Sequence, residues 1–222
     1  CAPVPLPPSV VRGGLLVKFC RCPSMSSMPT AAVPKLIVFD LDACLWTPEM
    51  YELSGRPTKY DAARGGVAAG GDVVRLFSGA AAVLARFLPG GDPRLSSATV
   101  AVASSTTEPA AYAATCLENL PVSPERGETV ADLVDHRQIY PGSKGRQHFP
   151  ALQRETGVPF DQMLFFDDCT YGDNCGDVAR SCPGVACVRT PHGLTEALFD
   201  AGLAAFARGE RGVLDAVKDA VK

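Results

Sequence analysis

The chain alternates short, continuously apolar segments with longer segments in which apolar residues recur at helical spacing. The short segments have the length of strands and are rich in β-branched or aromatic residues. This is typical of strands that are buried on both faces of a parallel sheet. The pattern therefore predicts four strands, namely KLIVF (35–39), TVAVA (99–103), QMLFF (162–166) and VACVR (185–189).

The longer segments are predicted to be helices, and they cover residues 79–88, 108–120, 145–157 and 194–209. Pro109 lies near the first turn of the second segment, and the third and fourth segments end at Gly157 and Gly209. These positions agree with the usual start and stop signals of helices. A final amphipathic helix is predicted in the tail, residues 211–222, whose apolar face would comprise Val213, Leu214, Val217 and Val221.

Regular alternation of strands and helices predicts an α/β fold, a doubly wound parallel sheet in three α/β/α layers of the Rossmann-like type. We assign the folded domain to residues 35–222, with a small insertion at about 47–78. The glycine-rich segment 63–72 is expected to be a flexible surface insertion. It is not a P-loop, because it lacks the lysine and the strand–helix context that such a loop requires.

The composition indicates an ordinary globular protein. The chain has 222 residues, of which 46% are hydrophobic and 20% are charged, and its net charge is −3. This charge gives no electrostatic reason to expect a nucleic acid or an anionic membrane as partner. No run of 18 or more apolar residues is present, so no transmembrane helix is predicted.

The N-terminal residues 1–34 differ from the rest in composition. The first 39 residues contain seven prolines, four basic residues and no acidic residue. Such a segment is either a disordered leader or an organelle transit peptide. We therefore expect a cytoplasmic protein, or a plastid or mitochondrial one if the leader is a transit peptide.

The nine cysteines show no C-x₂-C spacing, so the usual zinc signature is absent. Reduced thiols in an intracellular or organellar compartment are the favoured interpretation. A regulatory disulfide or a metal site in the group Cys169, Cys175, Cys182 and Cys187 remains the alternative.

Polar residues follow each predicted strand, at the edge of the sheet where ligands bind in open α/β folds. Asp40 and Asp42 follow the first strand, and the second is followed by Ser104 and Ser105. Lys144 precedes the third helix. The strand at 162–166 leads into acidic residues, which are Asp167, Asp168 and, further on, Asp173. Acids, hydroxyls and an ammonium group together predict a site for a divalent cation and a phosphate.

Electrostatics supports a cation at this site. Asp40 and Asp42 are two residues apart in an extended segment, so their side chains can face the same pocket. Two carboxylates about 4 Å apart repel by roughly 4 kcal/mol at an effective dielectric constant of 20. Mg²⁺ would offset this repulsion, because it prefers oxygen ligands and is usually held by one or two carboxylates together with a substrate phosphate.

Four motifs, in this order, resemble those of the haloacid dehalogenase superfamily, and more narrowly its magnesium-dependent phosphatase-1 family, of the acid phosphatase type. They are FDLDACLW (39–46), VAVASST (100–106), IYPGSK (139–144) followed by His148 and Phe149, and TGVPFDQMLFFDD (156–168). The motifs span about 130 residues. The resemblance implies the Rossmann-like fold of that superfamily, with a minimal cap or none.

The resemblance also implies a role for each site residue. Asp40 would attack phosphorus and become an aspartyl phosphate, and Asp42 would protonate the leaving oxygen and then activate water. Ser104 and Lys144 would bind the phosphoryl group, with Ser105 beside them. Mg²⁺ would lie between Asp40, the backbone carbonyl of Asp42, and Asp167.

Three departures from the family pattern stand out. Cys44 replaces a usual threonine or valine, and its thiol could make the site oxidisable. Ser105 replaces a frequent arginine. The loop after Asp168 is about two residues longer, which leaves Asp168 and Asp173 as supporting residues without a defined role.

The histidines (His136, His148 and His192) are expected at the surface or behind the site, and Trp46 lines the pocket or belongs to the core. The favoured function is a Mg²⁺-dependent phosphomonoesterase acting on phosphotyrosine-like, sugar-phosphate or phosphorylated or glycated protein substrates. The alternatives are a catalytically silent phosphate-binding protein and a phosphoserine protein phosphatase of the same superfamily. The sequence does not indicate the oligomeric state.

Overall fold

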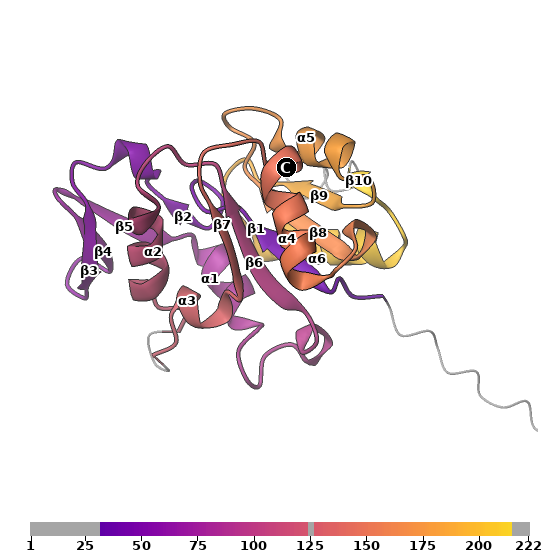
Figure 1. Ribbon diagram of the computed structural model, residues 1–222. Helices are drawn as coiled ribbons and strands as arrows, with labels where there is room; N and C mark the ends of the chain where they lie inside the picture. Colours follow the sequence, from indigo (N-terminus) through magenta and orange to yellow (C-terminus); the bar gives the residue numbers. More distant parts are fainter. Residues whose placement is uncertain (1–31, 124–126, 215–222) are drawn as a thin grey trace, which may run out of the picture. The chain divides into compact units, whose positions relative to one another are not determined.

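The computed structural model describes residues 32–123 and 127–214. Its main sheet has six parallel strands in the order β10-β9-β8-β1-β6-β7 (Figure 1). The strands are β1 (Leu36–Phe39), β6 (Thr99–Ser104), β7 (His136–Ile139), β8 (Met163–Asp167), β9 (Ala186–Arg189) and β10 (Gly212–Val213). All four predicted strands are present, and the predicted fold class is confirmed.

Strand β1 lies between β6 and β8, and its four residues are fully buried. Its side chains alternate between two hydrophobic cores. Ile37 and Phe39 belong to one core, and Leu36 and Val38 belong to the other. A strand buried on both faces has no room for a polar side chain until it ends, which explains the continuous apolar run before Asp40.

Helices cover both faces of the sheet, as the two cores show. The core that contains Phe39 receives side chains from α1 (Ser78–Ala85), α2 (Ala110–Asn119) and α6 (Glu196–Ala207). The core that contains Val38 receives them from α4 (Phe149–Thr156) and α5 (Asn174–Ser181). The result is three layers, α/β/α (Figure 1). The short helix α3 (Val130–Leu133) precedes β7.

The glycine-rich insertion forms regular structure. A second, four-stranded antiparallel sheet has the order β2-β5-β4-β3. It comprises β2 (Trp46–Thr47), β3 (Pro57–Asp61), β4 (Gly66–Ala69) and β5 (Asp72–Leu76), with the 3₁₀ turn η1 (Met50–Glu52) between β2 and β3. The expectation of a flexible insertion at 63–72 was therefore wrong. A Cβ at Gly66 would lie 2.3 Å from the carbonyl oxygen of Val74, so this glycine permits the close pairing of two strands.

The predicted C-terminal helix does not begin where the pattern placed it. Gly212 and Val213 form β10, which pairs with β9 as a parallel edge strand. Val217 and Val221, like the leader before residue 32, lie outside the described residues. Within 32–123 and 127–214, no helix is both long enough and apolar enough to cross a membrane.

Candidate active site

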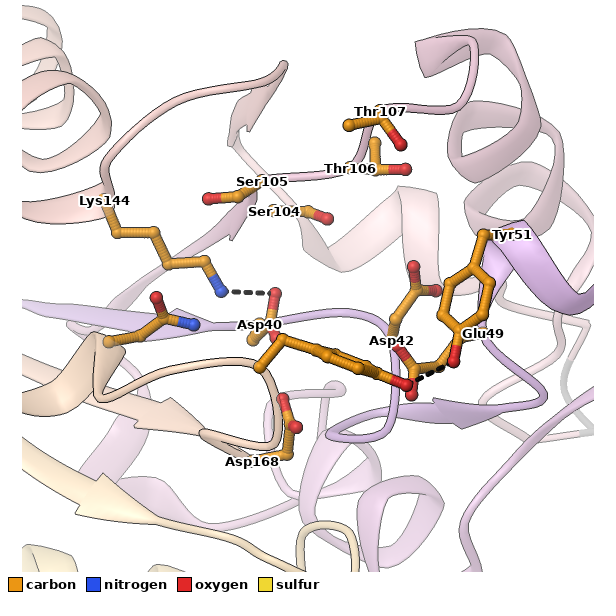
Figure 2. A pocket seen from close by; sticks show the side chains of 12 residues that line it. Asp40, Asp42, Glu49, Tyr51, Ser104, Ser105, Thr106, Thr107, Lys144 and Asp168 are labelled. Carbon is orange, nitrogen blue, oxygen red and sulfur yellow. Dashed lines mark hydrogen bonds and ion pairs between the residues drawn. The ribbon is translucent and has the colours of Figure 1, made fainter.

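The polar residues at the strand ends line one cavity of about 450 Å³ (Figure 2). Asp40 follows β1, Ser104 ends β6, and Asp168 follows β8. Lys144 begins a π-helical turn, η3 (Lys144–His148), which leads directly into α4. The cavity is lined by Asp40, Asp42, Glu49, Tyr51, Ser104, Ser105, Thr106, Thr107, Lys144, Asp168, Tyr171 and Asn174.

Lys144 connects two of the strand ends. Its Nζ atom lies 2.7 Å from Oδ1 of Asp40 and 2.5 Å from Oδ2 of Asp167. The side chain is only 2% exposed, and Asp167 is fully buried. Ser143 caps the turn by accepting a hydrogen bond from the backbone N–H of Arg146, so the position of Lys144 is fixed from its N-terminal side.

Burial and charge act in opposite directions on this pair. Burial raises the pKa of Asp40, and the ammonium group of Lys144 partly opposes this. The nearby Asp167 raises the pKa further, so that it lies well above its usual range. Burial alone would lower the pKa of Lys144, but the carboxylates of Asp40 and Asp167 raise it above its usual value. Lys144 is thus held as a cation, while burial disfavours the ionised form of Asp40.

Asp42 has different surroundings from Asp40. The indole Nε1 of Trp46, which is fully buried, donates a hydrogen bond of 2.6 Å to Oδ1 of Asp42. Burial raises the pKa of Asp42, and the bond from Trp46 partly opposes this. Trp46 therefore holds the Asp42 side chain in place, while the raised pKa suits a group that donates and accepts protons.

The two adjacent acids after β8 occupy different positions. Both oxygens of Asp167 accept hydrogen bonds, Oδ1 from the backbone N–H of Cys169 at 2.8 Å and Oδ2 from Lys144. The amide of Asn174 donates to both of these oxygens, at 3.1 and 3.3 Å. Asp168 instead lines the cavity. The sequence did not distinguish the two acids in this way.

A divalent cation fits the acidic part of this site. Asp40, Asp167 and Asp168 each offer a carboxylate oxygen, and these oxygens lie within 4.8 Å of one another. Among the residues lining the cavity, Lys144 is the only one with a cationic side chain. One ammonium group cannot neutralise three carboxylates, and hard oxygen donors are the ligands that Mg²⁺ prefers.

Two left-handed residues flank the acids. Ala43, directly after Asp42, has φ +55°, and Cys169, directly after Asp168, has φ +59°. They are the only non-glycine residues with positive φ within 32–123 and 127–214. This conformation costs about 1–2 kcal/mol per residue for an L-amino acid, and such strain is often retained at functional sites.

The hydroxyl residues Ser104 and Ser105 line the cavity, and a buried histidine lies behind them. Ser104 is 3% exposed, and Ser105 donates a hydrogen bond of 2.8 Å to the carbonyl of Gly142. Nε2 of His148 lies 3.1 Å from the carbonyl oxygen of Ser104 and 3.0 Å from that of Tyr140, and Nδ1 lies 3.3 Å from that of Ser143. His148 is fully buried and joins the ends of β6 and β7.

Other predicted residues do not line the cavity. Asp173 is exposed; it caps α5 and forms an ion pair of 2.6 Å with Arg189. Cys44 is fully buried, and burial raises the pKa of its thiol well above the usual value. These surroundings disfavour the oxidation of Cys44 that the sequence suggested, because the thiolate is the reactive form of a cysteine.

Sequence reasoning missed several residues near the site. Asn174, Glu49, Tyr51 and Tyr171 belong to no motif that we identified, so only their three-dimensional position reveals them. His148, in contrast, carries a sequence signal, because it closely follows the IYPGSK motif and is expected at the surface or behind the site; it lies behind the site.

The fold and the site together define a member of the haloacid dehalogenase superfamily. An Asp-x-Asp segment ends the central strand of a parallel sheet, and a lysine from a later turn joins it to acids at the end of β8. A family model described as acid phosphatase matches residues 32–209. The chain belongs to this family. The family and the class of enzyme predicted from the sequence, a phosphatase, are thereby confirmed.

Individual proteins resemble the chain to different degrees. Magnesium-dependent phosphatase 1 from Homo sapiens is 35% identical over 191 residues, which cover 83% of this chain and 93% of the human protein. Among solved structures, CbbY from Rhodobacter sphaeroides, in complex with phosphate, is 14% identical with a TM-score of 0.48, over 74% of this chain and 89% of CbbY. The N-terminal part of BF1531 from Bacteroides fragilis contains a phosphatase domain complexed with Mg. It is 18% identical with a TM-score of 0.47, over 72% of this chain and 37% of that chain.

Proposed function

We propose that this member of the acid phosphatase family is a Mg²⁺-dependent phosphomonoesterase that works through an aspartyl phosphate on Asp40. The observation that carries the proposal is the bridge from Lys144 to Asp40 and Asp167 at the carboxyl ends of the strands. Ser104 and Asp168 line the same cavity. This arrangement brings a nucleophile, a hydroxyl donor, a fixed cation and acidic metal ligands to one place.

The chain's own residues account for the two half-reactions. The Asp40 carboxylate forms a bond to phosphorus as the bond to the leaving oxygen breaks, and Asp42 gives that oxygen its proton. Asp42, now ionised, accepts a proton from the water that attacks the phosphoryl group, and Asp40 is released. The separate surroundings of the two acids make these roles compatible, because Asp40 pairs with Lys144 and Asp42 with Trp46.

Asp40 and Asp168 are the residues that we assign to the cation, with the backbone carbonyl of Asp42. Mg²⁺ held by these residues would supply positive charge that favours the ionised form of Asp40 and offsets the charge of the phosphoryl oxygens. Asp167 belongs to the same acidic group, but both of its oxygens already accept hydrogen bonds. We therefore assign Asp167 mainly to the positioning of Lys144 and of the loop after β8.

Several substrates match this chemistry. Phosphotyrosine-like compounds, sugar phosphates and phosphorylated proteins all present a phosphomonoester, as does a glycated protein whose attached sugar carries a phosphate. The inner part of the cavity would recognise the phosphoryl group that they share. A silent phosphate-binding protein and a phosphoserine protein phosphatase are the rival functions. A panel of phosphopeptides and small phosphomonoesters separates the substrate classes.

The test is the hydrolysis of an aryl phosphate in the presence and absence of EDTA by the wild type, by Asp40→Asn and by Asp161→Asn. Asp161 is an exposed aspartate that does not line the cavity, so its substitution controls for the loss of one charge. We expect Mg²⁺-dependent turnover in the wild type and the control, and none in Asp40→Asn. Full activity of Asp40→Asn would contradict the mechanism, and Mg²⁺ binding without turnover on any substrate would favour the silent protein.

A further inference from the structure

The cavity has two chemically different ends. The inner end contains Asp40, Ser104 and Lys144, all of which are at most 6% exposed. Five other lining residues, Glu49, Tyr51, Thr106, Thr107 and Tyr171, are partly or fully exposed, and we call them the outer end. Figure 2 shows Lys144, Asp40 and Ser104 toward one side of the view. Glu49 and Tyr51 lie toward the other side, together with Asp42. The reaction proposed above uses the inner end and leaves the outer end without a role.

Two exposed tyrosines meet at the outer end. Tyr51 is 53% and Tyr171 is 72% exposed, and they are the only large hydrophobic side chains exposed to this degree within 32–123 and 127–214. Their hydroxyl groups form a hydrogen bond, which Figure 2 marks by a dashed line at Tyr51. Their ring centroids are 5.8 Å apart, with the planes at 85° in an edge-to-face arrangement.

The two tyrosines come from distant parts of the chain. Tyr51 belongs to η1, in the insertion between β1 and α1, and Tyr171 belongs to the loop between β8 and α5 that also carries Asp168. Their contact therefore joins the insertion to the loop that carries an acid of the site. An exposed contact between two hydroxyls is easily exchanged, since water or a ligand can replace either partner at little net cost.

The outer end also lacks a partner for a second anion. Among the residues lining the cavity, Lys144 is the only one with a cationic side chain, and it is already paired with Asp40 and Asp167. The outer end instead offers two phenol rings, two threonine hydroxyls and the Glu49 carboxyl group. Such surroundings bind through ring contacts and hydrogen bonds rather than through ion pairs.

We propose that Tyr51 and Tyr171 are specificity-determining residues that separate to admit the leaving group of the substrate and then contact it with their rings. This inference rests on the proposed phosphomonoesterase function. A leaving group must extend from the phosphorus atom at Asp40 toward the outer end, because the inner end is closed by buried side chains. The pair then discriminates among substrates by the size and surface of the leaving group, without taking part in the chemistry at phosphorus.

The experiment compares two substrates that differ in the reach of the leaving group. In acetyl phosphate the leaving group is too small to touch the outer end, whereas 2-naphthyl phosphate presents two fused rings to it. We expect Tyr51→Ala and Tyr171→Ala each to lower kcat/KM for 2-naphthyl phosphate about tenfold, mainly through KM, as the loss of one aromatic contact predicts. Turnover of acetyl phosphate should stay within about twofold of the wild type, which also shows that each variant is folded.

Conservative and matched variants complete the test. Tyr51→Phe and Tyr171→Phe lose the hydroxyl contact but keep the rings, so each should retain kcat/KM for 2-naphthyl phosphate within about threefold. Tyr60→Ala removes a tyrosine of β3 that does not line the cavity, and it should leave kcat/KM unchanged for both substrates. If an alanine variant fails to fold, the leucine variants Tyr51→Leu and Tyr171→Leu replace it in the comparison.

The outcomes separate the two proposals. Equal loss on both substrates, or no loss on 2-naphthyl phosphate in either variant, would overturn the role of the tyrosines and leave the phosphomonoesterase function standing. Failure of the wild type to hydrolyse either substrate with Mg²⁺ would overturn the proposed function and this inference together. A selective loss on the large substrate supports the inference.

Discussion

The ammonium nitrogen of Lys144 lies 2.7 Å from Oδ1 of Asp40, and both side chains are almost completely buried. The contact joins the end of the central strand β1 to the turn that precedes α4, two segments about a hundred residues apart in the chain. A buried charge is tolerated when it is paired with an opposite charge, and Asp40 and Lys144 are paired with each other in this way. This ion pair therefore fixes the position of the Asp40 carboxylate, the proposed nucleophile.

Replacing Lys144 by methionine should remove most of the activity. Without the ammonium group, Asp40 and Asp167 lose the cation that they share, and the phosphoryl group loses its fixed cation. We expect kcat to fall about 10²- to 10³-fold, the usual effect of losing one preorganised charge partner at the transition state. Steady-state hydrolysis of an aryl phosphate at saturating Mg²⁺ measures the effect. Lys59→Met, at an exposed position of β3, is the matched control and should retain full activity.

Asp42→Asn should separate the two half-reactions. An aryl leaving group departs without much help from an acid, but the hydrolysis of the aspartyl phosphate needs a base for water. We therefore expect a rapid burst of phenol release, close to one equivalent per enzyme, followed by turnover reduced about 10²- to 10⁴-fold. Rapid-quench kinetics measures the burst. Slow turnover without a burst would place Asp42 in the first step only.

The central part of the site could be predicted from the sequence because strand ends are easy to locate. Uniformly apolar runs identify buried parallel strands, and the polar residue that follows each run must lie at the ligand-binding edge. The sequence predicts Asp40, Ser104 and Asp167 at this edge in the same way. Lys144 can be grouped with these residues by its position before the third helix, but only the resemblance to a family implies that it contacts the phosphoryl group.

What the sequence did not predict depends on tertiary contacts. The glycines of the insertion indicated flexibility, yet Gly66 allows two strands to approach closely. The tail carries a helical pattern, but Gly212 and Val213 pair with the exposed edge of β9 instead. Asp167 ends β8 and Asp168 follows it, so their side chains point to different sides, but the sequence alone does not show which of the two faces the cavity.

Asp168→Asn should weaken the binding of Mg²⁺ and have little effect on the stability of the fold. Asp168 lines the cavity, so the loss of its charge removes a ligand from the proposed cation site. We expect the Mg²⁺ concentration for half-maximal activity to rise at least about tenfold, with little change in the melting temperature of the metal-free protein. Asp173→Asn is the matched control, because asparagine also caps a helix. Unchanged Mg²⁺ dependence in Asp168→Asn would return the ligand role to Asp167.

Cys44 should resist oxidation in the folded protein. Its thiol is fully buried, and burial raises its pKa well above the usual value, so little thiolate is available to react. We expect mild peroxide to leave Cys44 unmodified, as measured by peptide mass spectrometry, and activity to match that in dithiothreitol. The same treatment in urea should modify Cys44, which controls for detection. Rapid oxidation of Cys44 in the folded protein, with loss of activity, would contradict this prediction.

Asp92 should make the stability of the folded protein depend on pH in the acidic range. Its carboxylate accepts hydrogen bonds from the guanidinium groups of Arg94 and Arg86, at 2.6 and 2.8 Å, and Arg86 also pairs with Asp200 in α6. The bonds from Arg94, and after them those from Arg86, lower the pKa of Asp92 in the folded protein, although burial opposes them. The folded protein therefore binds fewer protons than the unfolded chain between the folded pKa and the unfolded value of about 3.9.

The stabilisation by Asp92 is consequently complete above the unfolded pKa and is lost as the pH falls through that range. Asp92→Asn should lower the melting temperature at pH 7 by about 2–4 °C, corresponding to roughly 1 kcal/mol for a partly screened ion pair in a chain of this size. At pH 3 the difference from the wild type should shrink, because the wild-type carboxylate begins to protonate on unfolding. Thermal melts of both proteins from pH 3 to pH 7 measure this, with Asp161→Asn as the control for the loss of one exposed carboxylate. A difference that does not change across this range would show that Asp92 stabilises the protein through its packing rather than its charge.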